Sequence, residues 1–343
     1  MNQTSQFLSA VPGQRPCIVV LDDYEQAFEA LADWQPVRKH AQLHIQTTPL
    51  KGAPLLELLA EADVVVLMRD RTPLLADLIA KLPRLKLVVF TGTRNQALDV
   101  AALAARGIPV CHTGWGPSKD STAELTWALI MAAHKRLVEN CNALMQRKSQ
   151  EGLEGHWRTP HALLPVLKGE TLGLVGLGEI GGRVARYAQA FGMEVLAWSP
   201  RMTAERAAEH GASFVDLDTL LARSRIVSLH LVVTAQTRGL INAERLALMR
   251  ADSLLVNTSR STLVDTAALL QALSQGRPAQ VALDVFDAEP LPEDAPLRSF
   301  PQALLSPHLG FVARPVFETF VQDARECVLA WLAGAPLPRV LAP

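Results

Sequence analysis

Leu172-Gly173-Leu174-Val175-Gly176-Leu177-Gly178-Glu179-Ile180-Gly181 is the stretch of sequence that decides the fold. An apolar run leads into glycines with the spacing G-x-G-x-x-G, and residues 183–191 then have the apolar periodicity of a helix. This order predicts a strand, a tight turn and a helix, which together are typical of a dinucleotide-binding fold. In such a turn Gly176 makes the bend, Gly178 lets the backbone approach a pyrophosphate, and Gly181 lets helix and strand pack closely.

The spacing alone is a weak signal, because glycine-rich turns are common. Its setting adds weight, because the turn lies near the middle of a chain of 343 residues. With roughly 150 residues to a domain, this length predicts two domains, each large enough for its own core. The residues before the turn must therefore form something besides the nucleotide fold.

The composition is that of an ordinary globular protein, with 49% hydrophobic and 20% charged residues. The formal net charge of -1 gives no excess of positive charge that would attract nucleic acid or an anionic membrane surface. No stretch approaches the roughly 20 uninterrupted apolar residues of a membrane span. We therefore expect a small-molecule partner, and neither nucleic acid nor a membrane.

Two features bear on the cellular compartment. Residues 1–14 lack a basic region followed by an apolar core, so we expect a frayed tail and no signal peptide. The four cysteines, Cys17, Cys111, Cys141 and Cys327, form no C-x-x-C pair. Free thiols in a reducing cytoplasm fit this pattern best.

Strands and helices are expected to alternate on both sides of the glycine turn, which predicts an α/β fold. Before the turn the predicted strands are 17–21, 64–68, 87–90 and 108–111, and the predicted helices are 54–61, 73–81 and 98–105. After it the predicted strands are 194–198, 226–229, 253–257, 280–285 and 303–306, and the predicted helices are 204–210, 217–222, 243–249 and 265–275. Together with the strand that enters the turn, six strands make a doubly wound sheet.

Two further helices are expected to connect the domains. Residues 121–146 predict one long helix, with Ser121 or Asp120 as its N-cap, that crosses between the domains. The final helix, 317–333, lies outside the alternation, so the chain is expected to return to the first domain.

Chemistry-bearing residues follow three late strands: Asn257-Thr258-Ser259-Arg260, Asp284 to Pro290, and Ser306-Pro307-His308-Leu309-Gly310. Ligands of open parallel sheets bind beyond the carboxyl ends of the strands, so these stretches should face one crevice. Arg260 can bind a carboxylate in two places and polarise a carbonyl. His308 can carry the proton that accompanies a hydride, and Glu289 can orient its ring and favour the imidazolium.

With these residues in place, the sequence resembles the D-isomer-specific 2-hydroxyacid dehydrogenase family, which includes glyoxylate and hydroxypyruvate reductases and phosphoglycerate dehydrogenases. The resemblance runs from about Val64 to the final helix. It includes Gly92-Thr93-Arg94-Asn95 with Asp99, Ser121-Thr122-Ala123-Glu124, His230-Leu231-Val232-Val233-Thr234 and Thr237-Arg238-Gly239-Leu240-Ile241. Matches in this order are far more specific than the glycine turn alone.

The resemblance implies an NAD(P)-dependent oxidoreductase with Arg260, Glu289 and His308 as catalytic residues, and a homodimer. Asp284 would hold the nicotinamide carboxamide. The implied dinucleotide-binding domain covers 118–310, inserted in a smaller, flavodoxin-like substrate domain of 1–117 and 311–343. The expected cofactor-binding residues are Gly176, Gly178, Glu179, Ile180, Gly181, Ser199, Arg201, Val232, Thr237, Thr258 and Asp284.

Three positions depart from the pattern of this family. Ser261 follows Arg260 where glycine is common, and Arg94 occupies a position that is often glycine. Glu179 replaces a residue that is often basic or polar, so it should point away from the pyrophosphate. These departures concern the detailed shape of the site rather than the reaction.

The identity of the nicotinamide cofactor depends on the end of the second strand of this domain. An acidic residue about 20 positions beyond the glycines would receive the ribose hydroxyl of NAD, and Ser199 occupies that position here. No carboxylate repels a 2'-phosphate, and Arg201 can attract one. The pattern favours NADP over NAD, with use of both as the next alternative. The simplest other interpretation is that Ser199-Pro200 forms a plain turn and that Arg201 is a surface charge.

The first domain is expected to contribute substrate contacts. Backbone donors of Gly92, Thr93 and Arg94 follow a strand and can hold a carboxylate. Arg69, in the stretch Met68 to Thr72, is a further candidate, although Arg69, Asp70 and Arg71 could equally form a surface ion-pair cluster.

The reaction expected from these residues is hydride transfer between NAD(P)H and a small 2-oxo or D-2-hydroxy acid, with glyoxylate or hydroxypyruvate as first candidates. No histidine, cysteine and acid spacing forms a metal cage, so no metal is expected. His134 is expected at the surface or an interface, and His230 near the adenine pocket. The alternatives are a dinucleotide-sensing, corepressor-like binding protein without turnover, and another Rossmann enzyme such as an amino-acid dehydrogenase.

Overall fold

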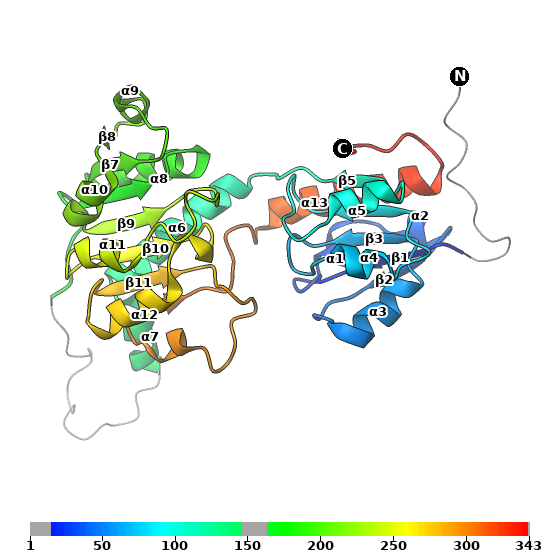
Figure 1. Cartoon of the computed structure of the whole chain (residues 1–343), viewed down its shortest axis with the longest axis horizontal. Coiled ribbons are helices and arrows are strands. Elements are labelled where there is room, and N and C mark those ends of the chain that lie inside the picture. The colour runs from blue at the N-terminus through cyan, green and yellow to red at the C-terminus, as the bar shows by residue number, and fades with distance from the viewer. Residues whose placement is uncertain (1–14, 146–162, 342–343) are drawn as a thin grey trace. The chain divides into compact units, whose positions relative to one another are not determined.

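A parallel β-sheet lies at the centre of each of two units in the computed structural model (Figure 1). One unit comprises Met1–Pro117 with Ala313–Pro343, and the other comprises Ser118–Val312. The structure describes residues 15–145 and 163–341. The expected N-terminal tail, residues 1–14, lies outside the described residues.

The first unit has a five-stranded parallel sheet of the order β2-β1-β3-β4-β5. This is the order of flavodoxin-like folds. Its strands are β1 (Cys17–Val20), β2 (Gln42–Ile45), β3 (Val64–Leu67), β4 (Leu87–Phe90) and β5 (Val110–His112). The apolar strands β1, β3 and β4 are buried at every position, as expected for a sheet covered on both faces.

Helices cover both faces of this sheet. The helices are α1 (Ala27–Leu31), α2 (Gln35–Arg38), α3 (Gly52–Ala60), α4 (Ala76–Ile79), α5 (Val100–Ala105) and α13 (Arg314–Leu332). The last of them, α13, contacts α1, α2, β4 and β5, so the chain returns to the first unit after completing the second. After α13 the chain pairs with β5, where Leu341 donates to the carbonyl of Val110.

The second unit has a seven-stranded parallel sheet of the order β12-β11-β10-β9-β6-β7-β8. Counted from β6, this is the doubly wound order 3-2-1-4-5-6 with one added strand. The strands are β6 (Thr171–Val175), β7 (Glu194–Trp198), β8 (Ser213–Phe214), β9 (Ile226–Leu229), β10 (Leu254–Asn257), β11 (Gln280–Leu283) and β12 (Ala303–Leu305).

Two helix layers enclose this sheet. One core contains residues of α6 and α8, and the other contains residues of α10, α11 and α12. The elements are α6 (Ser118–His134), α7 (Leu137–Met145), α8 (Glu179–Ala190), α9 (Ala204–Ala208), α10 (Leu217–Arg223), α11 (Ala243–Leu248), α12 (Thr266–Ser274) and the 3-10 turns Ser261–Leu263 and Pro296–Ser299.

The sequence interpretation missed two strands, β2 and β8. Both are edge strands: β2 reads Gln42-Leu43-His44-Ile45 and has no fully buried residue, and β8 is two exposed residues long. An edge strand need not be apolar on both faces, so the continuous apolar run that marks a central parallel strand is missing.

The single long helix predicted over 121–146 is wrong. The helix begins earlier, at Ser118, and ends at His134, and Arg136 then adopts φ +45° before α7 begins. No residue of α7 is buried, so this second helix has no core contact that would keep it in line with α6. The expected end at Gln146 lies outside the described residues.

Candidate active site

Six strands of the second unit end along one edge of the sheet, and the loops that follow them carry the predicted site residues. β10 ends at Asn257, β11 at Leu283 and β12 at Leu305, and each pairs in parallel with its neighbour. The three chemistry-bearing stretches therefore begin at the same edge, as parallel pairing requires.

Each glycine of the turn after β6 has a different constraint. Gly176 has φ +107°, and a Cβ there would lie 2.7 Å from the backbone of His230. A Cβ at Gly181 would lie 2.2 Å from the carbonyl oxygen of Gly176. At Gly178, the residue before α8, a Cβ would meet no described atom within 4 Å. No side chain of the described residues therefore covers the backbone at the start of α8. The amide groups at this helix N-terminus fit the phosphates of a dinucleotide.

The first residues of α8 have different surroundings. Glu179 is largely exposed and pairs with Lys119, while Ile180 is partly buried against the core. One turn later, Nε of Arg183 lies 2.5 Å from Oδ1 of Asp120. These two ion pairs link the start of α6 to the start of α8. The pair with Lys119 balances the negative charge of Glu179.

The segment after β7 carries cations and no carboxylate. Ser199 is half-buried and Arg201 is exposed. Nη1 of Arg206 lies 3.5 Å from the carbonyl oxygen of Arg201, so a second guanidinium lies beside this segment. The sequence interpretation did not include Arg206. Its position could have been noticed from the sequence, because it lies three residues after Thr203, the N-cap of α9, and five residues after Arg201.

Two hydroxyls expected at the cofactor have partners inside the protein. Oγ1 of Thr237, which is buried, accepts from the amide of Thr234 at 2.8 Å and donates to the carbonyl of Val232 at 2.9 Å. Val232 is 62% exposed. The hydroxyl of Thr258 lies 2.8 Å from that of Thr126.

His308 and Glu289 form the central pair of the site. Nδ1 of His308 lies 2.6 Å from Oε2 of Glu289, and the other carboxylate oxygen accepts from the amide of Phe286 at 2.9 Å. Burial raises the pKa of Glu289, but the hydrogen bond and the charge of His308 outweigh it and hold that pKa below its ordinary value. His308 has φ +54°, a left-handed conformation that is uncommon for residues other than glycine.

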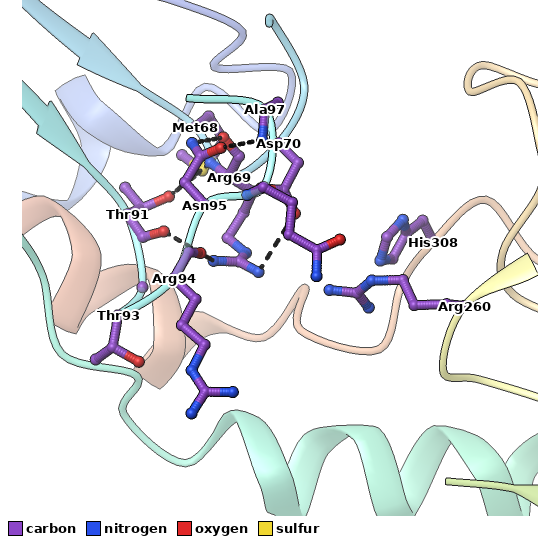
Figure 2. Close-up of polar contacts among 12 residues, drawn as sticks. Met68, Arg69, Asp70, Thr91, Thr93, Arg94, Asn95, Ala97, Arg260 and His308 are labelled. Carbon is purple, nitrogen blue, oxygen red and sulfur yellow. Dashed lines mark hydrogen bonds and ion pairs between the residues drawn. The ribbon is translucent and has the colours of Figure 1, made fainter. Parts of the chain in front are cut away.

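Arg260 extends from the loop after β10. The side-chain amide of Asn257 shapes this loop, because its nitrogen donates to the carbonyl of Arg260 at 2.9 Å and its oxygen accepts from the amide of Ser259 at 3.0 Å. Figure 2 shows the side chains of Arg260 and His308, which come from two loops of the same unit. The positive charge of Arg260 also lowers the pKa of Glu289, which brings all three groups into one electrostatic cluster.

Asp284, which follows β11, is completely buried. Its Oδ1 accepts from the hydroxyl of Ser306 at 2.6 Å and from the amide of Leu309 at 2.8 Å, and its Oδ2 accepts from the amide of Gly310 at 3.0 Å. Burial raises the pKa of Asp284, and these hydrogen bonds oppose that rise.

In the first unit, Arg69 is only 7% exposed and holds the loop after β4 (Figure 2). Its Nη1 donates to the carbonyl of Thr91 at 2.9 Å and to that of Arg94 at 3.1 Å, and its guanidinium lies 4.2 Å from the ring centroid of Trp115. Asn95 donates in turn to the carbonyl of Arg69 at 2.8 Å. Both ends of the loop are therefore fastened to the same arginine.

The expected ion-pair cluster exists in part. Arg71 pairs with Glu25 at 2.6 Å, whereas Nη2 of Arg69 lies 3.9 Å from the carboxylate of Asp70. Arg71 therefore forms an ion pair, as the surface-cluster interpretation expected. Arg69 differs from it, because its guanidinium mainly holds the backbone of the loop after β4.

The loop that Arg69 holds leaves some groups exposed. The amide of Gly92 donates to the hydroxyl of Thr113 at 2.7 Å, and Gly92 has φ +87°. Thr93 and Arg94 are exposed, and the hydroxyl of Thr93 accepts from the indole of Trp115. In Figure 2 the side chain of Arg94 extends away from Arg69.

Two histidines lie elsewhere in the second unit. His134 was expected at the surface or an interface; it is instead 5% exposed within the second unit, where α6 contacts β10 and β11, and burial lowers its pKa to about 4. The ring of His230 lies 2.9 Å from the hydroxyl of Ser228, and burial lowers its pKa to about 4 as well.

Comparison with known proteins gives one consistent answer. A family model described as "D-isomer specific 2-hydroxyacid dehydrogenase, NAD binding domain" matches residues 127–310. A glyoxylate reductase of Aeropyrum pernix is 35% identical over 330 residues, which cover 96% of each chain. The chain belongs to the D-isomer specific 2-hydroxyacid dehydrogenase family.

Further relatives of this dehydrogenase agree. A D-3-phosphoglycerate dehydrogenase of Methanocaldococcus jannaschii is 35% identical over 268 residues, covering 77% of this chain and 48% of the relative. The crystal structure of a phosphoglycerate oxidoreductase from Vibrio cholerae superposes with a TM-score of 0.83 and 34% identity, over 94% of this chain and 100% of the other. The predicted α/β fold with two Rossmann-like domains is thereby confirmed, and the protein is an NAD(P)-dependent 2-hydroxyacid oxidoreductase.

Within 15–145 and 163–341, no group of three or more histidine, cysteine, aspartate or glutamate side chains is arranged to hold a metal ion. In those same ranges, no helix has the length and apolar character needed to cross a membrane.

The sequence interpretation assigned no role to the residues that shape the loops, although Asn257 and Ser306 stand in the chemistry-bearing stretches. Asn257 orders the arginine loop, Ser306 bonds to Asp284, and Thr113 bonds to Gly92. Of these, Asn257 had a local signal, since asparagine at a strand end commonly bonds to the backbone two residues on. The other two bonds join segments distant in sequence, which no local pattern reveals.

Proposed function

We propose that this dehydrogenase transfers a hydride between NAD(P)H and a small 2-oxo acid, with glyoxylate and hydroxypyruvate as the first candidates. The observation that carries this proposal is the His308–Glu289 pair at 2.6 Å, with the charge of Arg260 acting on the same carboxylate. Proton transfer and carboxylate binding are the two functions that such a substrate requires from side chains. The relatives named glyoxylate reductase support the choice of substrate.

His308 is the proposed acid and base. Since Nδ1 is bonded to Glu289, Nε2 is the ring atom left to exchange a proton with the substrate oxygen. The edge-to-face contact with Phe311, with ring centroids 5.7 Å apart, further limits rotation of the imidazole. Glu289 keeps the ring oriented through this bond.

Arg260 is the proposed carboxylate-binding residue. Its guanidinium is always charged, and it can form two parallel bonds with a carboxylate while polarising the adjacent carbonyl. Nη1 already donates to the carbonyl of Ser259 at 2.7 Å, which restricts the side chain to one direction. A preset direction lowers the entropy lost when substrate binds.

The proposed dinucleotide site lies along the strand ends of the second unit. The bare backbone at Gly178 and the N-terminus of α8 suit the pyrophosphate, and Val232 suits the adenine. When bound, the nicotinamide ring donates or accepts the hydride. The full proposed set is Gly176, Gly178, Glu179, Ile180, Gly181, Ser199, Arg201, Val232, Thr237, Thr258 and Asp284, of which Thr237 and Thr258 would contribute by shaping their loops.

We favour NADP over NAD, with use of both as the next alternative. Ser199 leaves the ribose position without a carboxylate, and Arg201 with Arg206 supplies two guanidinium groups beside it. Positive charge at this position attracts a 2'-phosphate, whereas an acid there would repel it.

In the first unit, the proposed substrate-binding residues are Gly92, Thr93, Arg94 and Arg69. Since the Gly92 amide is bonded to Thr113, the amides of Thr93 and Arg94 and the Arg94 guanidinium are the donors proposed to contact substrate. Arg69 would act through the loop backbone that it holds.

The roles of the two units follow. We assign dinucleotide binding to 118–310 and substrate binding to 1–117 with 311–343; the compact units themselves divide at 312–313 on the return. We also propose a homodimer, supported by the exposed apolar side chains of α7: Leu137, Val138, Leu144 and Met145. A cytoplasmic location is supported by four free cysteines.

A spectrophotometric screen of 2-oxo acids with NADH and NADPH tests this proposal, with a His308→Ala variant run in parallel. We expect oxidation of the reduced cofactor with glyoxylate or hydroxypyruvate, and a loss of about 100-fold or more in kcat in the variant. Cofactor binding without turnover of any 2-oxo acid would instead favour a dinucleotide-sensing protein. Turnover that requires ammonia would favour an amino-acid dehydrogenase.

A further inference from the structure

One completely buried carboxylate fastens the loop that carries the proposed acid and base. The donors to Asp284 lie on both sides of His308 in the chain: Ser306 precedes it, and Leu309 and Gly310 follow it. Gly310 is also held from α6, because Thr122 donates to its carbonyl at 2.9 Å. The loop is therefore anchored at its two ends, with His308 between the anchors.

The backbone of His308 needs such anchors. Its φ of +54° is unfavourable for a residue with a Cβ, and such conformations persist only where the surrounding structure over-determines them. The local bond from the His308 amide to the carbonyl of Ser306, at 3.0 Å, closes a tight turn. The three bonds to Asp284, together with the bond from the Ser306 amide to the carbonyl of Leu283 at 2.8 Å, hold this turn against the end of β11.

The direction of the imidazole follows from that backbone. A side chain leaves a left-handed residue in a different direction from an extended one, so a relaxed turn would move Nδ1 away from Glu289. The bond between them, 2.6 Å long, leaves little tolerance for such a shift. Asp284 and Glu289 thus hold the histidine by its backbone and by its ring, respectively.

We propose that Asp284 is a positioning residue for His308: besides its proposed place among the cofactor-binding residues, its carboxylate holds the 306–310 loop, which sets the direction of the imidazole. This inference rests on the proposed function, because it takes His308 as the acid and base. The charge of Asp284 is needed for the task, because an ionised carboxylate is acceptor-only and meets three donors here. An asparagine would point an NH2 group at a backbone amide or at the serine hydroxyl.

Asp284→Asn and Ser306→Ala test the proposal together, with Ser299→Ala as the control for loss of an exposed serine hydroxyl that bonds only to the carbonyl of Pro296. We expect Asp284→Asn to lower kcat at least 30-fold, roughly the scale of a misplaced catalytic group. The Kd of reduced cofactor, followed by fluorescence, should change less than threefold in Ser306→Ala, which leaves the carboxylate of Asp284 in place. Ser306→Ala should lower kcat about three- to tenfold, and Ser299→Ala should leave it unchanged.

The double variant separates the two roles of Asp284. Because Ser306 acts through the carboxylate of Asp284, the double variant should be no slower than Asp284→Asn alone. If Asp284→Asn weakens cofactor binding but leaves kcat at saturating cofactor unchanged, Asp284 acts only as a cofactor contact and the proposal is overturned. Should Asp284→Asn fail to fold, an unchanged kcat in Ser306→Ala overturns the proposal by itself.

A measurement without turnover keeps this inference distinct from the proposed function. In protein labelled with 15N at histidine, the His308 signals, assigned by their absence in His308→Ala, report the bond of Nδ1 to Glu289 in the cofactor-free protein. We expect Ser306→Ala or Asp284→Asn to shift the Nδ1 signal, and an unshifted signal in both overturns the proposal. If the wild-type protein reduces no 2-oxo acid, the proposed function fails, and the NMR result still decides whether Asp284 positions His308.

Discussion

Oε2 of Glu289 lies 2.6 Å from Nδ1 of His308, although the two residues come from different loops of the second unit. The carboxylate is itself held by the Phe286 amide, which bonds to its other oxygen. The pair is therefore fixed at both partners, and the proposed catalysis depends on this arrangement.

Glu289→Gln should lower kcat by about 10- to 100-fold. The amide keeps the size of the side chain but removes the negative charge that bonds to Nδ1, while the histidine itself remains available for proton transfer. Steady-state kinetics with the best 2-oxo acid measures the effect. Glu293→Gln, an exposed acid four residues away, provides the control. Equal kcat values in the two variants would remove Glu289 from the proposed mechanism.

The choice between NADPH and NADH should depend on the cations after β7. Replacing Arg201 and Arg206 by alanine is expected to weaken NADPH binding about tenfold or more, because charge-assisted bonds to a phosphate are lost, and to leave NADH nearly unaffected. Fluorescence titration of both reduced cofactors measures this. Ser199→Asp should shift preference towards NADH. Tighter binding of NADH than NADPH by the wild-type protein would contradict the expected preference.

Two alanine substitutions in the glycine turn should act differently. Gly181→Ala would place a Cβ 2.2 Å from the Gly176 carbonyl, so we expect a loss of stability of about 1–3 kcal/mol together with weaker cofactor binding. Gly178→Ala meets no described atom within 4 Å, so the melting temperature should change little while cofactor binding weakens. Thermal unfolding with and without cofactor checks both. Unchanged cofactor affinity in Gly178→Ala would mean that the pyrophosphate does not approach this backbone.

Arg94→Ala should raise the KM for the substrate about tenfold, the effect of losing one charge-assisted hydrogen bond. We expect a larger rise for 2-oxo acids with a second anionic group, because these can use both the loop amides and the guanidinium. Lys81→Ala, which removes one exposed positive charge elsewhere in the same unit, serves as the control. The proposed role of Arg94 fails if KM is unchanged for every substrate tested.

Stability should fall as the pH is lowered from about 6.5 to 4, because of His134. Its pKa is lowered to about 4 by burial, so between these values the unfolded chain binds a proton that the folded protein does not. Unfolding by urea at pH 7 and pH 5 measures this difference. His134→Leu should reduce it, and part of the difference should remain, since the pKa of His230 is lowered to about 4 as well. An identical pH dependence in the variant would show that His134 is not the cause.

The sequence predicted the central parts of both sheets because buried parallel strands are apolar runs. β1, β3 and β4 were recognised in this way, and the glycine spacing identified β6 and α8. The edge strands β2 and β8 escaped, since exposure removes the apolar run. The break at Arg136 escaped as well, because apolar residues continue at helical spacing beyond it.

By itself, the sequence determined the α/β class, the location of the glycine turn and the residue types that the chemistry needs, since all of these depend on local spacing. Only the tertiary structure decided how those residues are held. Asp284 bonds to a loop more than 20 residues away, and Arg69 fastens the Thr91–Asn95 loop from a neighbouring strand. The sequence predicts that parallel strands bring these segments to one edge of a sheet, but which donor meets which acceptor there depends on the folded backbone of each loop.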